Sequence, residues 1–154
     1  MRRKDREVTD LREIIAIMSR CDSCSLALFD KDYPYVIPLC FAAEVSGGKI
    51  VLYFHCATEG HKIDLIKRDP RAAFSMSCSH ELILSGDSGT MRYESVCGNG
   101  RIEIVGDAEK VFCLRAIMEK YAGLMGRQWS DDALKAVTVL KLTVANISGK
   151  RNKG

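Results

Sequence analysis

The run Gly60-His61-Lys62 has the residue types of an anion-binding turn. It lies between an apolar stretch, residues 50–54, and a short amphipathic segment that ends at Pro70. The first stretch is typical of a strand covered on both faces, and the second of a helix that the proline stops. The first N–H groups of a helix have no partner within it, and with the helix dipole they attract anions. The pattern therefore predicts an anion site, most naturally for a phosphate, with Lys62 as a point charge and His61 as a donor.

The same stretch has a simpler interpretation. Helix N-termini are common and most bind only water, so residues 50–71 would be a strand–helix connection with a basic surface. Thr58 is the expected N-cap of this helix. His55 and Cys56 end the preceding strand, and His55 also fits the description of a half-buried histidine with a structural role. Both interpretations remain open from the spacing alone.

Two other segments have features of a ligand contact. Residues 36–39, with the letters VIPL, contain a proline that cannot donate to a ladder. We therefore expect an edge strand, a bulged strand, or a strand whose missing hydrogen bond faces something other than a neighbouring strand. Such a strand can lie along a flat aromatic ligand, or it can be an ordinary edge. Residues 93–101 contain Ser95, a candidate phosphate donor, and glycines at 98 and 100 that allow close backbone approach. A bulged core strand explains the second segment equally well.

Cys21 and Cys24 form a CxxC pair, which can be half of a zinc site or a redox pair. No second CxxC is present, and the pair does not follow a strand at the start of a helix as in thioredoxin-like proteins. The spacing of His55 and His61 is not that of a helical metal-binding pair. Two incidental thiols are the simpler interpretation. The sequence contains no P-loop, GxGxxG or GxSxG motif, and no carboxylate pair stands out as an acid–base couple.

The composition is that of an ordinary globular protein. The 154 residues suffice for one domain with a sizeable core, and 47% are hydrophobic and 28% charged. The net charge of +3 is too small to indicate a nucleic-acid partner. No apolar run is long enough to cross a bilayer, and no signal-type segment follows the charged N-terminus. We therefore expect a cytoplasmic protein whose seven cysteines are thiols.

The elements expected around these segments are mainly strands. Apolar spacing predicts helices over residues 10–21 and 107–123, in addition to the helix before Pro70. Strands are predicted over residues 25–29, 35–41, 50–54, 72–78, 91–105 and 137–147. Short connections, among them a Gly47-Gly48 hairpin turn, indicate antiparallel pairing and hence a small closed barrel of six strands with helices at its side. A single domain over residues 1–154 is expected, with flexible tails at 1–8 and 149–154.

Several motifs in a fixed order resemble those of a known family. They are PYVIPL, a Gly-Gly hairpin, YFHCATEGHKIDLIKRDPRAAF and YESVCGNGRIEIV. In this order they resemble the flavin-binding split barrel of the pyridoxamine-phosphate-oxidase-like superfamily, and within it the nitroimidazole-resistance subgroup. The resemblance covers nearly the whole chain, residues 10–147. It implies a mainly β fold, a six-stranded antiparallel split β-barrel with flanking helices, that forms a homodimer with two FMN sites at the subunit interface.

The resemblance also assigns residues to the FMN site. The residues that would lie along the isoalloxazine are Val36, Ile37, Pro38 and Leu39, and those that would line the site from the next strand are His55, Cys56 and Ala57. The phosphate would be held by Gly60, His61 and Lys62. The partner subunit would contribute Ser95, Val96 and Trp129. Much of the superfamily has an arginine where His61 stands, and the histidine weakens the positive charge on the phosphate at neutral pH.

The resemblance implies an FMN-dependent oxidoreductase that passes electrons from NAD(P)H to a small aromatic or nitro acceptor. His55 and His61 are the candidates for the histidine associated with activity in the subgroup. The Arg- and His-rich tail of true pyridoxamine phosphate oxidases is missing, which argues against pyridoxamine phosphate as the substrate. Two alternatives remain: a flavin- or haem-binding sensor or storage module without turnover, and a metal-binding module built on Cys21, Cys24 and a histidine.

Overall fold

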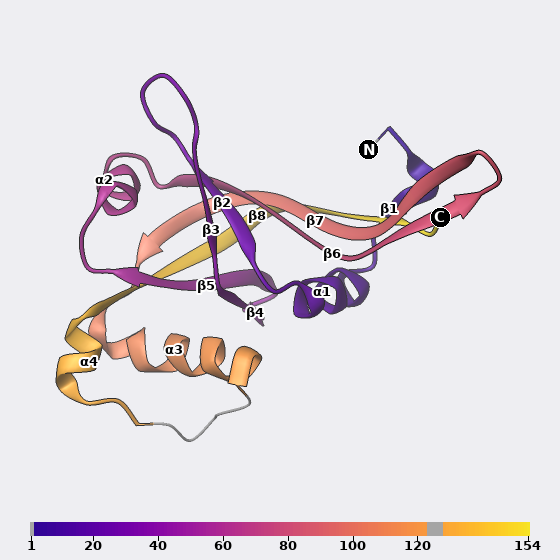
Figure 1. The fold of residues 1–154 in the computed structure, drawn as a ribbon. Coiled ribbons are helices and arrows are strands. Elements are labelled where there is room, and N and C mark those ends of the chain that lie inside the picture. The colour runs from indigo at the N-terminus through magenta and orange to yellow at the C-terminus, as the bar shows by residue number, and fades with distance from the viewer. Residues whose placement is uncertain (1, 123–127) are drawn as a thin grey trace.

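Eight strands make up about half of the chain in a computed structural model that describes residues 2–122 and 128–154 (Figure 1). In chain order the strands are β1 (Glu7–Val8), β2 (Cys24–Leu28), β3 (Tyr35–Leu39), β4 (Phe41–Ser46), β5 (Lys49–Ala57), β6 (Arg71–Ser85), β7 (Ser88–Ile104) and β8 (Val137–Asn152). The helices are the 3-10 turn η1 (Lys4–Arg6), α1 (Leu11–Arg20), α2 (His61–Arg68), α3 (Asp107–Ala122) and α4 (Asp131–Lys135). Among them, no helix of the described residues is both long and apolar enough to cross a membrane.

All the strands pair antiparallel in one sheet, in the order β3-β2-β6-β7-β8-β5-β4, with β1 beside β8. The two end strands, β3 and β4, are consecutive in the sequence and Cys40 alone joins them. Seven flat strands would place these edges roughly 29 Å apart, while the one-residue link spans at most about 7.6 Å. The sheet must therefore curl until its edges meet. No ladder joins β3 to β4 within the described ranges, so the barrel is split along this seam.

The mainly antiparallel β fold with flanking helices is confirmed, but the predicted count of six strands is wrong. The expected strand over residues 35–41 ends at Leu39, and a separate strand begins at Phe41 on the opposite edge of the sheet. The short β1 is the second addition. Strand β1 has only two residues, too few for a periodicity, and β4 follows β3 after one residue, so no turn signal separates the two.

Local chemistry determines the ends of several elements. The Asp10 carboxylate accepts a hydrogen bond from the main-chain N–H of Arg12 at 2.8 Å and caps α1. The β4–β5 hairpin turns at Gly47 and Gly48, whose φ angles of 56° and 77° are the positive values that a primed turn requires. Helix α2 ends before Pro70, as predicted.

Parts of both predicted tails belong to the sheet: residues 7–8 form β1, and residues 149–152 are the end of β8. Strand β1 pairs with β8 at Gly149, where a Cβ would lie 2.9 Å from Val8 Cβ and 3.0 Å from Ile14 Cγ1. Only glycine admits this close approach. Arg151 Nε lies 2.6 Å from Glu94 Oε1 on β7. Charged residues at a chain end suggested solvent exposure, but Arg151 forms an ion pair with Glu94, which is distant in the sequence.

The core has two parts, one on each side of β5. Phe54 and Leu52 point into the barrel, and Val51 and Tyr53 point to the layer covered by α3. Strand β5 is thus covered on both faces, which explains its continuous apolar run. This burial fixes the end of β5 and, four residues later, the start of α2.

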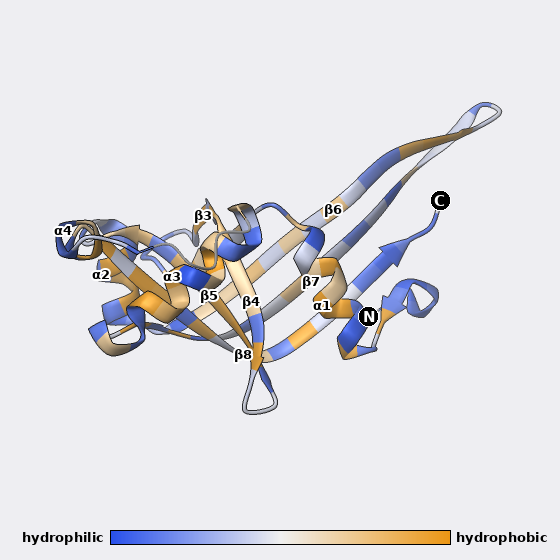
Figure 2. Ribbon diagram, turned by 90° about the horizontal axis from the view of Figure 1, so that it is seen from below, coloured by the Kyte–Doolittle hydropathy of each residue, from blue (hydrophilic) through white to orange (hydrophobic). Residues whose placement is uncertain are grey.

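The β6–β7 hairpin projects beyond the barrel as an arm (Figure 1, Figure 2). Leu82 and Met91 face each other across the two strands, and Leu82, Leu84 and Met91 are 59%, 73% and 45% exposed. No described residue covers this apolar stretch of the arm.

Candidate functional site

The start of α2 carries main-chain donors that the helix does not use. Gly60 precedes it with φ 122° and ψ 169°, a region essentially restricted to glycine. The Gly60 carbonyl accepts the N–H groups of Ile63 at 2.9 Å and Asp64 at 3.3 Å. The N–H groups of His61 and Lys62 belong to the first turn and have no intrahelical acceptor. The predicted N-cap, Thr58, is wrong, because the extended turn at Gly60 takes the cap position and has no side chain to cap with.

The loop between β2 and β3 holds the His61 ring. His61 Nε2 lies 2.5 Å from Asp30 Oδ2, and the Tyr35 ring meets the imidazole edge to face at a centroid distance of 5.2 Å. Arg68, at the other end of α2, donates to the Phe29 carbonyl at 3.0 Å. The hydrogen bond with His61 is the main cause that lowers the pKa of Asp30, so this carboxylate stays ionised. One ring nitrogen of His61 is thus engaged, and the other has no hydrogen-bond partner among the described residues.

Lys62 stands beside the end of β5. Within the described residues its ammonium group makes no hydrogen bond and no ion pair. Burial raises the pKa of the Cys56 thiol, and the positive charge of Lys62 partly opposes this rise. Cys56 is therefore a neutral thiol close to an unpaired cation, which fits an anion site better than a nucleophilic one.

The predicted β3 residues divide between the two faces of their strand. Ile37 and Leu39 are half-buried against the core inside the barrel, while Val36 is 58% exposed and Pro38 is exposed. Among the described strands, β3 pairs with β2 alone and is an edge strand, as Pro38 predicted. Its first residue, Tyr35, brings it against α2.

Two connections link the predicted segments in one chain: Tyr35, the first residue of β3, packs on His61, and residues 58–60 join the end of β5 to α2. His55, Ala57 and Gly60 are exposed beside them. The outward face of this region is open surface in a single chain, whereas a bound small molecule is usually buried over most of its area. The geometry fits the phosphate end of a ligand and leaves the cover for its flat part to come from elsewhere.

The three residues expected from a partner subunit lie on other elements, Ser95 and Val96 on β7 and Trp129 just before α4. Ser95 is half-buried on β7, opposite Ser77 of β6. Val96 is fully buried and its side chain packs in its own barrel, so that side chain is not available to a second copy. Trp129 is half-buried against the core layer beneath α3.

Sequence reasoning missed Asp30, Tyr35 and Arg68 as neighbours of His61. Asp30 stands in a polar turn of the kind that usually faces water, and 31 positions separate it from His61. No local spacing could have identified this contact.

The CxxC pair has a structural environment. Cys21 and Cys24 are fully buried, and burial raises the pKa of each to about 12. The Cys21 carbonyl accepts a hydrogen bond from Lys120 Nζ at 2.7 Å, and the Asp22 carbonyl accepts one from the Tyr121 hydroxyl at 2.6 Å. The main chain of the motif thus holds the end of α3 through these two hydrogen bonds. In the described part of the chain, no three His, Cys, Asp or Glu side chains are grouped to hold a metal ion.

Comparison with solved structures finds relatives that span almost the whole chain. A candidate 5-nitroimidazole antibiotic resistance protein from Bacteroides thetaiotaomicron has 31% sequence identity and a TM-score of 0.84, covering 94% of this chain and 86% of its own. The FAD and haem binding protein from Mycobacterium smegmatis has 21% identity and a TM-score of 0.81, covering 97% of this chain and 74% of its own. The flavocytochrome from Azotobacter vinelandii has 21% sequence identity and a TM-score of 0.81, covering 100% of this chain and 72% of its own. These last two show the fold alone.

No protein with a curated description matches the chain at a significant level. A family model described as pyridoxamine 5'-phosphate oxidase matches residues 10–151. The match includes all eight strands except β1 and the last residue of β8. The chain belongs to the pyridoxamine 5'-phosphate oxidase family.

Proposed function

We propose that the chain binds FMN and acts as an oxidoreductase that passes electrons from NAD(P)H to a small acceptor. The first turn of α2 carries this proposal: it combines the free N–H groups of His61 and Lys62, the turn at Gly60 and an ammonium group without a partner in the described residues. Helix N-termini with an adjacent lysine suit a phosphate dianion. The names of the relatives, which include flavin-binding proteins and a candidate nitroimidazole resistance protein, support a flavin and a nitro or other small aromatic acceptor.

Each element has a separate role in this proposal. The α2 turn would hold the phosphate, and the β3 edge would lie along the ring system, where the missing N–H of Pro38 leaves an apolar stretch. Asp30 and Tyr35 would fix the His61 ring so that its second nitrogen faces the phosphate. Bound FMN would supply hydride and electron transfer, which no side chain at this site provides.

We propose in addition that two copies form the complete site. The β3 and α2 surface is open in one chain, and the β6–β7 arm exposes Leu82, Leu84 and Met91. A second copy that covers both would exclude water from the ring system and bury the apolar arm. The main chain near Ser95 is the part of β7 that would face the cofactor of the partner, because the Val96 side chain is occupied in its own core.

The phosphate assignment is tested by titrating the protein with FMN and with riboflavin, which lacks the phosphate. We expect Lys62→Ala to weaken FMN binding about tenfold or more and riboflavin binding little, since a hydrogen bond to a charged group contributes about 1.5–3 kcal/mol. Lys67→Ala is the matched control, because Lys67 is exposed in the last turn of the same helix. Equal losses for FMN and riboflavin would refute the assignment, and a wild-type protein that binds neither would refute the flavin function.

A flavin-binding module without turnover is the second candidate. The neutral Cys56 thiol and the engagement of His61 by Asp30 favour it, because they leave few groups at the site for proton transfer. NAD(P)H oxidation by the FMN-loaded protein separates the two candidates. NAD(P)H oxidation at a catalytic rate with a nitroaromatic acceptor excludes the non-catalytic module. FMN binding in the absorption spectrum without NAD(P)H oxidation excludes the oxidoreductase.

A further inference from the structure

Strand β8 has an open edge in its middle. On one side it pairs with β7 along nearly its whole length. On the other side β5 covers residues 137–143 and β1 covers residues 149–150, so residues 144–148 have no strand partner there in the described chain. Five residues of extended chain correspond to about 16 Å of edge. Main-chain N–H and C=O groups at such an edge can pair with another extended chain.

A bulge creates this gap. The β7–β8 register shifts between Asn99 and Gly100, which leaves Ala145 as the extra residue of β8. Bulges bend the strand that carries them. Strand β5 stops pairing at the Val51–Thr143 pair, next to the bulge, so the two strands diverge and leave a wedge between them.

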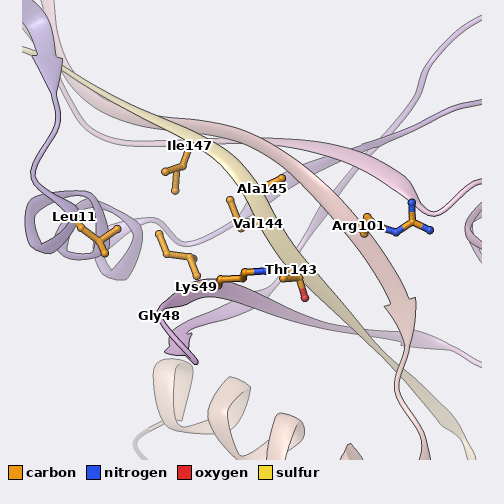
Figure 3. Close-up of a pocket in the computed structure, with 9 residues that line it drawn as sticks. Leu11, Gly48, Lys49, Arg101, Thr143, Val144, Ala145 and Ile147 are labelled. Carbon is orange, nitrogen blue, oxygen red and sulfur yellow. The ribbon is translucent and has the colours of Figure 1, made fainter.

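A hollow of about 550 Å³ occupies the wedge (Figure 3). Its walls are mainly apolar and come from the start of α1, the β4–β5 hairpin and β8; they include Leu11, Ile50, Val144 and Ile147. Leu11 is at one end of the view in Figure 3 and Arg101 at the other, with the open stretch of β8 between them. The volume lies within the range of natural ligand sites, about 300–1,000 Å³.

The charge of the hollow is of one sign. Lys49 and Arg101 line it, and its lining contains no acidic residue. Neither cation has a hydrogen bond or an ion pair with another described residue. The hydrogen bond from Arg71 is the main cause that lowers the pKa of Asp69, and the positive charge of Arg101 contributes only a weak electrostatic effect to this lowering. An occupant that carries a carboxylate would therefore gain an ion pair without displacing one.

We propose that this wedge binds an extended, partly apolar peptide segment with an acidic residue, which adds as a strand to residues 144–148 of β8. The open main-chain edge requires an extended backbone, the apolar walls accept side chains on alternate positions, and the two cations select an acidic residue. An amphipathic small molecule would use the walls and the charge but would leave the edge unpaired. The wedge lies at the start of β5, whereas the proposed flavin phosphate site follows its end, so this inference goes beyond the proposed function.

Five labelled pentapeptides of alternating valine and threonine, with one aspartate at each position in turn, are suitable probes. Fluorescence polarisation should give a submillimolar dissociation constant for at least one of them. Replacing its aspartate by lysine should lower the affinity about tenfold, and N-methylation of alternate amides should abolish binding, because a methylated nitrogen cannot donate to β8. Lys49→Glu should also lower the affinity about tenfold. Lys67→Glu, on α2, is the matched control and should change nothing.

Amide NMR shifts locate the binding site, and we expect the largest changes at residues 144–148 and at Ile50. Shifts elsewhere would overturn the proposal. It would equally be overturned if no probe binds at millimolar concentration, or if the N-methylated probes bind as well as the parent. Sodium decanoate, an anion without a peptide backbone, is the comparison ligand. Shifts at the wedge with decanoate and none with the peptides would assign the wedge to small amphipathic anions instead.

Discussion

The substitution Gly100→Ala tests the bulge on which the shape of the barrel depends. Gly100 lies on β7 at the register shift with β8, opposite Val144. A Cβ added there would lie 2.0 Å from the Thr143 carbonyl oxygen and 3.0 Å from Val144 Cα. Both are backbone atoms of the neighbouring strand, so no side-chain rotation can relieve the overlap. The two strands must separate at the bulge.

The expected loss follows from this geometry. Overpacking a core usually destabilises by about 1–3 kcal/mol, and occasionally by more where the contact cannot relax. We expect Gly100→Ala to reach about 3 kcal/mol or more, a large part of the roughly 5–15 kcal/mol of a typical domain. For a chain of this length, 3 kcal/mol corresponds to a decrease of the melting temperature of roughly 6–12 °C.

Urea unfolding followed by circular dichroism measures this loss, and two other glycines calibrate it. At Gly98 a Cβ would lie 2.6 Å from the Asn146 carbonyl oxygen and 2.6 Å from the Phe74 ring, which can move in part. At Gly106 a Cβ meets nothing within 4 Å. The destabilisation by alanine should therefore decrease in the order Gly100, Gly98, Gly106, and the loss for Gly106→Ala should stay below about 1 kcal/mol. If Gly100→Ala and Gly106→Ala lose the same small amount, the register and the bulge are incorrect.

Three further predictions concern the site, the arm and α3. Gly60→Ala should lower both the FMN affinity and the free energy of unfolding, the latter by about 1–3 kcal/mol, because φ 122° is strained for alanine; FMN titration and urea unfolding measure the two effects. Leu84→Glu should convert a dimer to a folded monomer in analytical ultracentrifugation, because it places a charge in the apolar stretch of the arm. Burial lowers the pKa of Lys120 from 10.5 to about 8, so the unfolded chain binds the extra proton between these values. Stability should therefore rise with pH from about 8 to about 10.5, and Lys120→Met should flatten the rise in urea unfolding across this range.

The predictions that succeeded rest on chemistry within a few residues of chain. Gly47-Gly48 requires a turn with positive φ, and Asp10 can reach the free N–H of Arg12 whatever the rest of the molecule does. Pro38 lacks a donor, so a strand that contains it is favoured at an edge or at a bulge. Each of these signals restricts the backbone directly, and the structure follows each of them.

The features that the sequence did not predict depend on contacts between distant segments. Asp30 meets His61 across 31 positions, and the charged C-terminal residues of β8 find partners on β7. Polar residues that satisfy one another in this way have no apolar periodicity, and they look like solvent-exposed loops or tails. The predicted N-cap at Thr58 was wrong for a different, local reason, because the positive φ of Gly60 gives the chain a second way to enter the helix.

The seam between β3 and β4 connects these observations to function. A barrel that closes by ladder hydrogen bonds resists opening along its whole length, but no ladder joins these two strands in the described chain. The hydrogen bonds and the ring contact between the β2–β3 hairpin and α2 are made by side chains. Tyr35 and Asp30 contact His61, and Arg68 donates to the Phe29 carbonyl. Exchanging a few such contacts for those of a ligand leaves the sheet intact. A cofactor phosphate at the first turn of α2 can therefore be accommodated at little expense to the fold, which is a physical reason for placing the proposed phosphate site at this turn.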